Sequence, residues 1–479
     1  MMDERILEEF KRIVGEGRVL WKAEDLIPYS RDMTENEPHM PDLVLLPSSF
    51  EEVRETVLTA NRYRIPIVPV VANTNVGGLA IPLRGGIVLD LKDMKSILYV
   101  DEDSMFAVIE PGVTFKDLRE YLDANHINLI PGYPLAPPNA SVLCNCILQG
   151  LANLSLRYGD SSSWVNGLEA ILGDGTVVRV GTAALFGNEE YDKWFARIPL
   201  PDLTGFFLGW QGSTGVVTKI SVKLWPKPYF RKRLFVPIFD IDSSHMAMMD
   251  LSRSGAFDDI GLVSWALTRM AFGQYEMEMD RDEPLFYLYI DISGNTLEEI
   301  RAKERISELL LGSLRRHGFK IDRPIPVENL ISIAKGFSKF SDFPMFLDFL
   351  CETEKGGLSW VGTYGPPRGW PEATRRGMGL MEEMGIPPAV VSRSMEMGRY
   401  RVLRFLHVFD KAEEEERDMA RNLNERLLEI CLEHGFVPYK APSWAVAKLK
   451  ERLDPGFKSL MESVKRIADP NGIMNPGRW

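Results

Sequence analysis

A glycine-bearing loop that follows an apolar segment near residue 70 limits what the first part of this chain can fold into. Residues 65–70 read as a short strand, and the loop after them, residues 72–80, holds the adjacent glycines Gly77 and Gly78 among small polar residues. Glycine lets backbone amides approach a ligand closely, and successive N–H groups form an anion nest. The spacing is neither a dinucleotide-binding G-x-G-x-x-G nor a Walker loop. The loop alone leaves open whether it binds an anion or is a surface turn.

Short apolar segments alternate with helical patterns over the first half of the chain. An apolar segment at 43–46 precedes a helix that opens at Ser49, with Glu52 at capping-box spacing. Further strand candidates lie at 65–70 and 86–91, and a hairpin over 168–180 turns at Gly173-Asp174-Gly175. This pattern predicts a sheet-rich α+β domain.

The pattern changes after Pro226 and Pro228, where regular structure is hard to continue. Apolar strands are expected at 285–290 and 402–409, and long amphipathic helices at 296–317 and 411–434. A chain of 479 residues exceeds the usual size of one hydrophobic core. We therefore predict a first domain over 1–228, an inserted α+β cap domain built on an antiparallel sheet over 229–435, and a segment over 436–479 that completes the first domain.

Composition excludes several functional classes. The formal net charge of -12 and a pI near 5.3 argue against binding to nucleic acid. The N-terminus has no basic stretch followed by an apolar run, and no segment approaches ~18 apolar residues, so we expect a cytoplasmic protein with no membrane span. Cys144-Asn145-Cys146 lacks a second Cys or His pair at metal-ligand spacing, so no metal site is predicted.

Six segments in fixed order resemble the FAD-binding framework of the vanillyl-alcohol oxidase and p-cresol methylhydroxylase superfamily. Besides the glycine loop and the closing residues 469–477, they are Glu110-Pro111-Gly112-Val113, Ser141-Val142-Leu143-Cys144-Asn145, Tyr158-Gly159-Asp160 and Gly212-Ser213-Thr214-Gly215-Val216-Val217-Thr218. The resemblance implies a two-part FAD-binding domain of sheet and helices, with the diphosphate against residues 72–80, the adenine side near Val216 and Val217, and the ring facing the cap. The cofactor-binding residues that it implies are Ala72, Asn73, Thr74, Asn75, Val76, Gly77, Gly78, Pro111, Ser141, Val142, Asn145, Tyr158, Gly159, Gly215, Val216, Val217 and Asn475.

The resemblance to the 4-phenol-oxidising branch continues at Gly435-Phe436-Val437-Pro438-Tyr439-Lys440, which is similar to that branch's Gly-Tyr-Gly-Glu-Tyr-Arg. There the Tyr-Arg pair holds the substrate phenolate. Tyr439 and Lys440 are thus the implied catalytic pair, since a phenol hydroxyl and an ammonium can stabilise an oxyanion. Tyr439 and Lys440 are equally consistent with ordinary packing at the boundary between two domains.

Two differences from the branch limit which of its residue roles can be assigned to this chain. Its Pro-Asp-Leu-Gly-Gly, whose Asp lies beside the flavin, is replaced by Leu135-Ala136-Pro137-Pro138-Asn139, so no carboxylate is expected there. The cap strand that carries a flavin-linking His or Tyr in some relatives reads Tyr400-Arg401-Val402-Leu403-Arg404-Phe405. We therefore predict noncovalent FAD, with Tyr400 as the nearby candidate for a link.

The resemblance implies an FAD-dependent oxidoreductase that passes a hydride from an aromatic or hydroxylated small molecule, such as a 4-alkylphenol or aromatic alcohol, to flavin N5, and then electrons to an acceptor. A cytochrome or iron-sulfur subunit, a quinone and dioxygen all remain open as acceptors, and we expect a homo-oligomer. One alternative is a 2-hydroxyacid dehydrogenase with an iron-sulfur partner, although its His-x-Gly-Asp-Gly-Asn-x-His motif is absent; His407 lies instead in an apolar strand. A second is a flavin-binding scaffold subunit of an electron-transfer complex.

Overall fold

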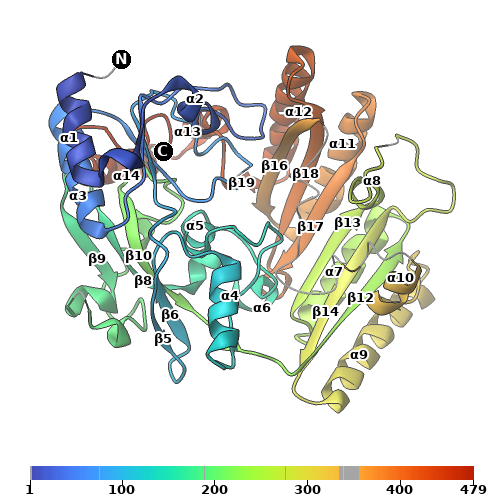
Figure 1. Cartoon of the computed structure of the whole chain (residues 1–479). Coiled ribbons are helices and arrows are strands. Elements are labelled where there is room, and N and C mark those ends of the chain that lie inside the picture. Colours follow the sequence, from blue (N-terminus) through green and yellow to red (C-terminus); the bar gives the residue numbers. More distant parts are fainter. Residues whose placement is uncertain (1–2, 75, 188, 276, 334–337, 339–354) are drawn as a thin grey trace.

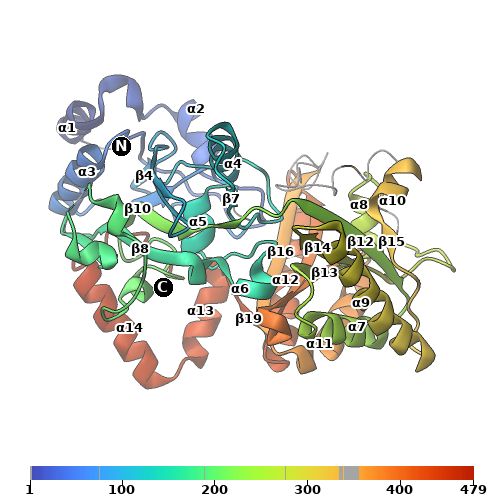
Figure 2. The same ribbon diagram turned by 90° about the horizontal axis from the view of Figure 1, so that it is seen from below.

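The computed structural model describes residues 3–74, 76–187, 189–275, 277–333, 338 and 355–479. The chain forms two lobes that lie side by side in both views (Figures 1 and 2). One lobe contains the N-terminal half of the chain and the C-terminal helices, and the other is built on a single large sheet. The mixture of helices with largely antiparallel sheets confirms the predicted α+β class.

The glycine loop leaves from a four-stranded sheet in the first lobe. Its order is β1 (Val19–Leu20), β2 (Leu43–Leu45), β4 (Ile87–Asp90) and β3 (Ile67–Val70), with β2, β4 and β3 parallel. Helices α1 (Glu4–Val14) and α3 (Phe50–Tyr63) share a core with this sheet. Ser49 caps α3 by accepting the backbone N–H of Glu52, as the capping-box spacing predicts. The loop is therefore held at the end of a buried strand.

The second sheet of this lobe is antiparallel. Its order is β5 (Ile97–Asp101), β6 (Phe106–Ile109), β10 (Val216–Lys223), β8 (Val165–Ile171) and β9 (Val177–Gly181). The predicted hairpin at Gly173-Asp174-Gly175 joins β8 to β9. Helices α4 (Phe115–Ala124) and α5 (Val142–Ile147) pack on one face of this sheet through a shared apolar core.

The other lobe is built on one antiparallel sheet of eight strands. Their order is β15 (Ile325–Pro326), β12 (Phe230–Ile238), β14 (Phe286–Gly294), β13 (Asp259–Ser264), β17 (Ala389–Met395), β18 (Tyr400–Asp410), β16 (Gly356–Gly365) and β19 (Val437–Pro438). Four helices bury one face of the sheet: α7 (Ile241–Arg253), α9 (Leu297–Arg316), α11 (Trp370–Glu383) and α12 (Glu414–Glu433). The opposite face is turned toward the first lobe (Figure 2).

The chain returns to the first lobe after β19. Met474 forms a parallel bridge with Ile67, and Asn475 donates its backbone N–H to the Ile67 carbonyl at 2.7 Å. These contacts support the proposal that the C-terminal segment completes the first domain, although β19 extends the large sheet two residues past 435. The remaining elements are α2 (Ala23–Leu26), β7 (Leu129–Ile130), α6 (Ser155–Tyr158), β11 (Trp225–Pro226), α8 (Trp265–Met270), α10 (Val327–Ile333), α13 (Ser443–Arg452) and α14 (Pro455–Ala468).

Within the described residues, none of the helices has both the length and the apolar character that a transmembrane segment requires.

Candidate active site

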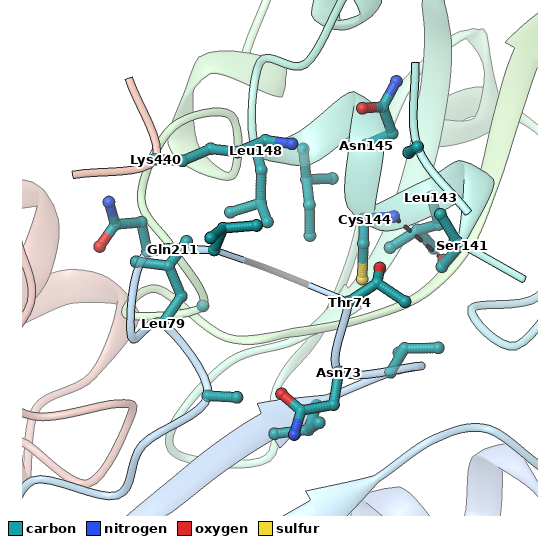
Figure 3. A pocket seen from close by; sticks show the side chains of 18 of the residues that line it. Asn73, Thr74, Leu79, Ser141, Leu143, Cys144, Asn145, Leu148, Gln211 and Lys440 are labelled. Atoms are coloured by element: carbon teal, nitrogen blue, oxygen red, sulfur yellow. Dashed lines mark hydrogen bonds between the residues drawn. The ribbon is translucent and has the colours of Figure 1, made fainter. Parts of the chain in front are cut away.

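A cavity lies between the two lobes, with about 1660 Å³ of empty space that includes its part open to solvent. From the first lobe it is lined by Asn73, Thr74 and Val76 of the glycine loop, by helix α5 and by the start of β10. Strands β16 and β18 line it from the second lobe. Figure 3 shows Lys440 and Gln211 on one side of the cavity and Ser141 and Cys144 of α5 on the other. A molecule bound in this cavity would therefore contact both lobes.

The loop after β3 adopts an uncommon backbone conformation. Ala72 and Asn73 have φ values of 57° and 47°, so two successive non-glycine residues are left-handed. Such residues cost about 1–3 kcal/mol each and gather at ligand clamps and active sites. Asn73, Thr74 and Val76 line the cavity, whereas the predicted residue Asn75 lies outside the described residues. The loop therefore borders the cavity, and its contact with a diphosphate stays a prediction.

Gly77 and Gly78 lie behind this wall rather than on it. Gly78 has a φ of 68°, and a Cβ there would approach Asn36 Cγ to 2.9 Å. Its N–H donates to Asp32 Oδ2 at 2.7 Å, and its carbonyl accepts a hydrogen bond from the guanidinium of Arg478. Gly78 is needed to hold the loop in place, and its amide is not free for a diphosphate in this conformation. Direct contact of the two glycines with the cofactor stays a prediction.

Ser141, Asn145 and Val142 come from helix α5. Ser141 Oγ accepts the N–H of Cys144 at 3.2 Å and donates to the Pro111 carbonyl at 2.6 Å, so Pro111 orients Ser141 from outside the cavity. Asn145 lines the cavity and donates to Ser161 Oγ at 2.8 Å. Val142 is buried in the core beneath the helix. The segment thus places two of its predicted residues at the cavity and uses the others as support.

The start of β10 follows strand alternation. Val217 lines the cavity, while Val216 packs on the opposite side in the core around the four-stranded sheet. Gly215 also lines the cavity, with a φ of 147°, and a Cβ there would lie 2.6 Å from the Ile171 carbonyl oxygen. Only glycine fits this position without displacing the neighbouring strand.

Tyr158 and Gly159 lie away from the cavity. Tyr158 is partly exposed and stacks on Trp225 with ring centroids 5.0 Å apart. A Cβ at Gly159 would approach Glu396 Oε1 to 2.8 Å. Both residues belong to the joint between the lobes, so a cofactor role for them is not supported by their position and stays a prediction.

Two buried oxygens on the cavity wall test whether the site suits a cofactor. Asn475 donates its Nδ2 to the Gln211 carbonyl at 2.7 Å, but its Oδ1 has no hydrogen-bond partner in the described structure. The Gln211 Oε1 is likewise buried and without a partner there. Buried acceptors are normally satisfied, so both oxygens call for donors from a bound molecule. The ribityl hydroxyls and ring N–H of FAD provide such donors, and the largely apolar lining suits a flavin ring.

Lys440 lines the cap side of the cavity, and Tyr439 lies next to it outside the described cavity lining. Tyr439 is buried, with its ring centroid 4.4 Å from that of Tyr364 and its N–H donated to the Gly362 carbonyl at 3.2 Å. Lys440 lines the cavity in a left-handed conformation with a φ of 50°. It makes no ion pair or hydrogen bond among the described residues. Burial, followed by the charge of Arg404, lowers the pKa of Lys440 to about 8.

Arg404 is a cavity residue that the sequence did not single out. It lies on β18, is buried, and donates a hydrogen bond from Nη2 to the hydroxyl of Tyr439. Its guanidinium sits 4.5 Å from the ring centroid of Trp360. In the described part of the chain it pairs with no carboxylate, and its Nε has no partner. The available signal was a charged side chain inside a largely apolar strand, a signal that Arg401 of the same strand shares.

Gly362 makes room for this arrangement. It lies opposite Arg404 in the β16–β18 ladder, and a Cβ there would be 3.2 Å from Tyr439 Cε1 and 3.6 Å from Arg404 Cγ. The absent side chain lets the tyrosine lie against the strand beside the guanidinium. Arg404, Tyr439 and Lys440, which we call the cationic end of the cavity, are therefore brought together by strand register.

The cavity lining contains no carboxylate among the described residues. Leu135, Ala136 and Pro137 line it where the phenol-oxidising branch has its Asp, in agreement with the predicted loss of that group. Tyr400 packs edge-on to Tyr364 with centroids 5.6 Å apart and is not part of the described lining.

The other candidate side chains divide between the cavity and the core. His407 packs 5.8 Å from Phe409 on the side of β18 away from Arg404, and burial lowers its pKa to about 4. Trp360 lines the cavity, whereas Trp210 lines a neighbouring hollow and Trp444 packs against the large core. Among the described residues no three His, Cys, Asp or Glu side chains cluster as metal ligands.

Comparisons with known proteins agree with this geometry. Residues 41–181 match the family described as FAD binding domain. The flavoprotein subunit of 4-cresol dehydrogenase (hydroxylating) from Pseudomonas putida is 23% identical, covering 99% of this chain and 95% of the relative. The D-2-hydroxyglutarate dehydrogenase of Stutzerimonas stutzeri is 24% identical, covering 100% and 99%. The crystal structure of p-cresol methylhydroxylase with substrate bound superposes with a TM-score of 0.87 at 22% identity, covering 99% and 96%.

Proposed function

Because this chain is an FAD-dependent oxidoreductase of the vanillyl-alcohol oxidase and p-cresol methylhydroxylase superfamily, we propose that it oxidises a small aromatic substrate held by an ionisable hydroxyl. The observation that carries the proposal is the cationic end of the cavity. Two cations, Arg404 and Lys440, lie there without a carboxylate partner in the described structure. Burying a charge without a counter-ion is costly, so this end favours an anionic ligand.

The side chains of the cationic end suit a phenolate. The nearby positive charges lower the pKa of a bound phenol and favour its ionised form. The Tyr439 oxygen accepts from Arg404 and so positions the guanidinium for the substrate oxygen, while direct donation from the Tyr439 O–H to the substrate stays a prediction. Leu358, Trp360 and Leu406 line the adjoining cavity and exclude water from an aromatic ring. When bound, FAD supplies the hydride acceptor, and the protein contributes orientation and charge.

Lys440 is the proposed site of proton exchange. The described lining contains no Asp, Glu or His, and burial raises the pKa of Cys144 to about 11. Lys440, with a pKa of about 8, is the group of this lining that can change protonation near neutral pH. In its neutral form Lys440 can take the proton of a bound phenol on Nζ, and the ammonium that results then stabilises the phenolate.

The test is reduction of the flavin by substrate without oxygen. Purified holoprotein is titrated anaerobically with 4-methylphenol, with an aromatic alcohol and with D-2-hydroxy acids, and the visible flavin absorbance is recorded. Bleaching by a phenol or aromatic alcohol is the expected result. Reduction by 2-hydroxy acids alone would reject the proposal.

A 2-hydroxy acid is the second candidate substrate, because the full-length likeness to a D-2-hydroxyglutarate dehydrogenase and a pair of cations also suit a carboxylate. A flavin-binding scaffold subunit would show no bleaching with any of these compounds. Cytoplasmic location, homo-oligomerisation and a cytochrome or iron-sulfur acceptor subunit stay predictions.

A further inference from the structure

A second hollow, with about 1200 Å³ of empty space that includes open solvent, adjoins the cationic end from outside. It is surrounded by the loop at 205–211, by the first turns of helix α14 and by Trp479. Helix α14 contributes the apolar side chains Phe457, Leu460, Met461 and Val464. Their spacing of three and four residues places them on one face of the helix.

This face of α14 has no partner in the described structure. Ala468 is the one buried residue of the helix, while Phe457 is 52% and Leu460 62% exposed. Figure 2 shows α13 and α14 as a hairpin that projects from the first lobe. Large apolar side chains gathered along a hollow mark a binding groove more often than scattered surface residues do.

The groove shares part of its wall with the active-site cavity. Leu148, Gln211 and Lys440 line both spaces, and Tyr439 lines the groove. The carboxylate in the described groove lining, Asp202, is already paired with Arg197 at 2.7 Å. A ligand in the groove would thus meet apolar walls along its length and a positive charge at the inner end.

We propose that the groove binds an apolar tail of the substrate, attached to the aromatic ring next to the ionisable hydroxyl. This rests on the proposed function, which puts that hydroxyl at the cationic end. A substituent beside the hydroxyl points toward the groove, whereas one opposite to it points away. The four α14 residues span about 10 Å of helix axis, which fits a chain of several methylenes. A narrow hollow that shares Lys440 with the cavity suits a slender chain better than the flat face of another protein.

The test compares three phenols by equilibrium dialysis under anaerobic conditions with holoenzyme whose flavin has first been reduced with dithionite, so that no phenol is oxidised during the measurement. They are 4-methylphenol, 4-methyl-2-octylphenol with the tail beside the hydroxyl, and its isomer 4-nonylphenol with the tail opposite. Wild type is compared with Leu460→Asp in the groove. Ile467→Asp is the matched control, because Ile467 is 68% exposed on the same helix and lies outside the groove lining.

Wild type and Ile467→Asp are expected to bind 4-methyl-2-octylphenol at least about tenfold more tightly than 4-methylphenol, since each buried methylene adds affinity. Leu460→Asp is expected to lose most of this gain while binding 4-methylphenol as before. An equal gain with 4-nonylphenol, or a gain that survives in Leu460→Asp, would overturn the inference.

Two further outcomes separate this inference from related ideas. If 4-methylphenol fails to bind wild type while the tailed phenol binds in a Leu460-dependent way, the groove stands and the proposed function fails. If sedimentation shows that Leu460→Asp alone dissociates an oligomer, the groove is an interface between copies of this chain, and the tail site is rejected.

Discussion

At the scale of single residues, Arg404 and Lys440 are two cations held close together by the fold. Arg404 is anchored by Tyr439 and Trp360, whereas Lys440 projects into the cavity with no ion-pair partner in the described structure. Their mutual repulsion contributes to the lowered pKa of Lys440. A bound anion relieves this repulsion, and that links substrate charge to the stability of the site.

Removing either charge should slow flavin reduction by substrate. Arg404→Met and Lys440→Met are each expected to lose about 2–4 kcal/mol of transition-state stabilisation, whereas Lys440→Arg keeps the charge and is tolerated. The loss of transition-state stabilisation is obtained from the rate of flavin reduction, measured by anaerobic stopped flow. The FAD content of each variant is recorded as well. Arg399→Met, an exposed change beside β18, serves as the control. A wild-type rate in both Met variants would place the substrate elsewhere.

Lys440 also predicts how stability depends on pH. Its pKa is lowered from 10.5 to about 8 on folding, so between these values the unfolded chain binds the extra proton and folding becomes more favourable as pH rises. Below pH 8 the folded protein carries a buried charge in full. Lys440→Met should therefore raise Tm at pH 7, and its advantage should shrink as pH rises from 8 toward 10.5. A pH-independent difference in Tm would contradict the assigned pKa.

At the scale of elements, the glycine loop is clamped from behind by the two ends of the chain. Asp32 accepts the N–H of Gly78, and Arg478 donates to the carbonyls of Gly78 and Ile81. Both charged side chains are buried. Asp32 and Arg478, which lie near opposite ends of the sequence, thus hold the loop in the conformation that lines the cavity. The loop does not hold this conformation alone.

Breaking this clamp should release the cofactor. Arg478→Met leaves the loop carbonyls unpaired, and Asp32→Asn keeps the side-chain shape while removing its charge; each is expected to lower FAD content several-fold. The FAD content of each variant is measured as the ratio of flavin absorbance to protein absorbance after gel filtration. Arg466→Met, on the exposed side of α14, should retain full FAD. Full retention in both clamp variants would show that the loop keeps its shape unaided.

At the scale of the whole molecule, FAD would be enclosed between the two lobes rather than tied to either. The cavity is walled by the first lobe, by β16 and β18, and by the returning C-terminal segment. The described lining carries no His or Tyr, and its Cys144 has a pKa raised by burial, which disfavours the reactive thiolate. Enclosure, and not a covalent bond, is therefore expected to retain the cofactor.

Acid precipitation tests this expectation directly. Denaturation opens the cavity, so the yellow colour should move to the supernatant. Colour that stays in the pellet would establish a covalent link, and a Tyr400→Phe variant would then show whether the link is at that residue.

The sequence by itself determined the features whose chemistry is local. The Ser49 cap of α3, the turn at Gly173-Asp174-Gly175 and the ordered cofactor segments depend on residues a few positions apart. For this reason the α+β class and the FAD framework were predictable without coordinates.

Only the tertiary structure decided how the site is assembled. Arg404 meets Tyr439 because β16 and β18 pair with Gly362 opposite Arg404, and a register cannot be read from composition or spacing. The unsatisfied oxygen of Asn475 reaches the cavity because the C-terminus returns to Ile67 and Gln211. The groove beside α14 arises where that helix stands clear of the lobe. Each of these depends on contacts between distant segments, which folding brings together and a linear pattern does not encode.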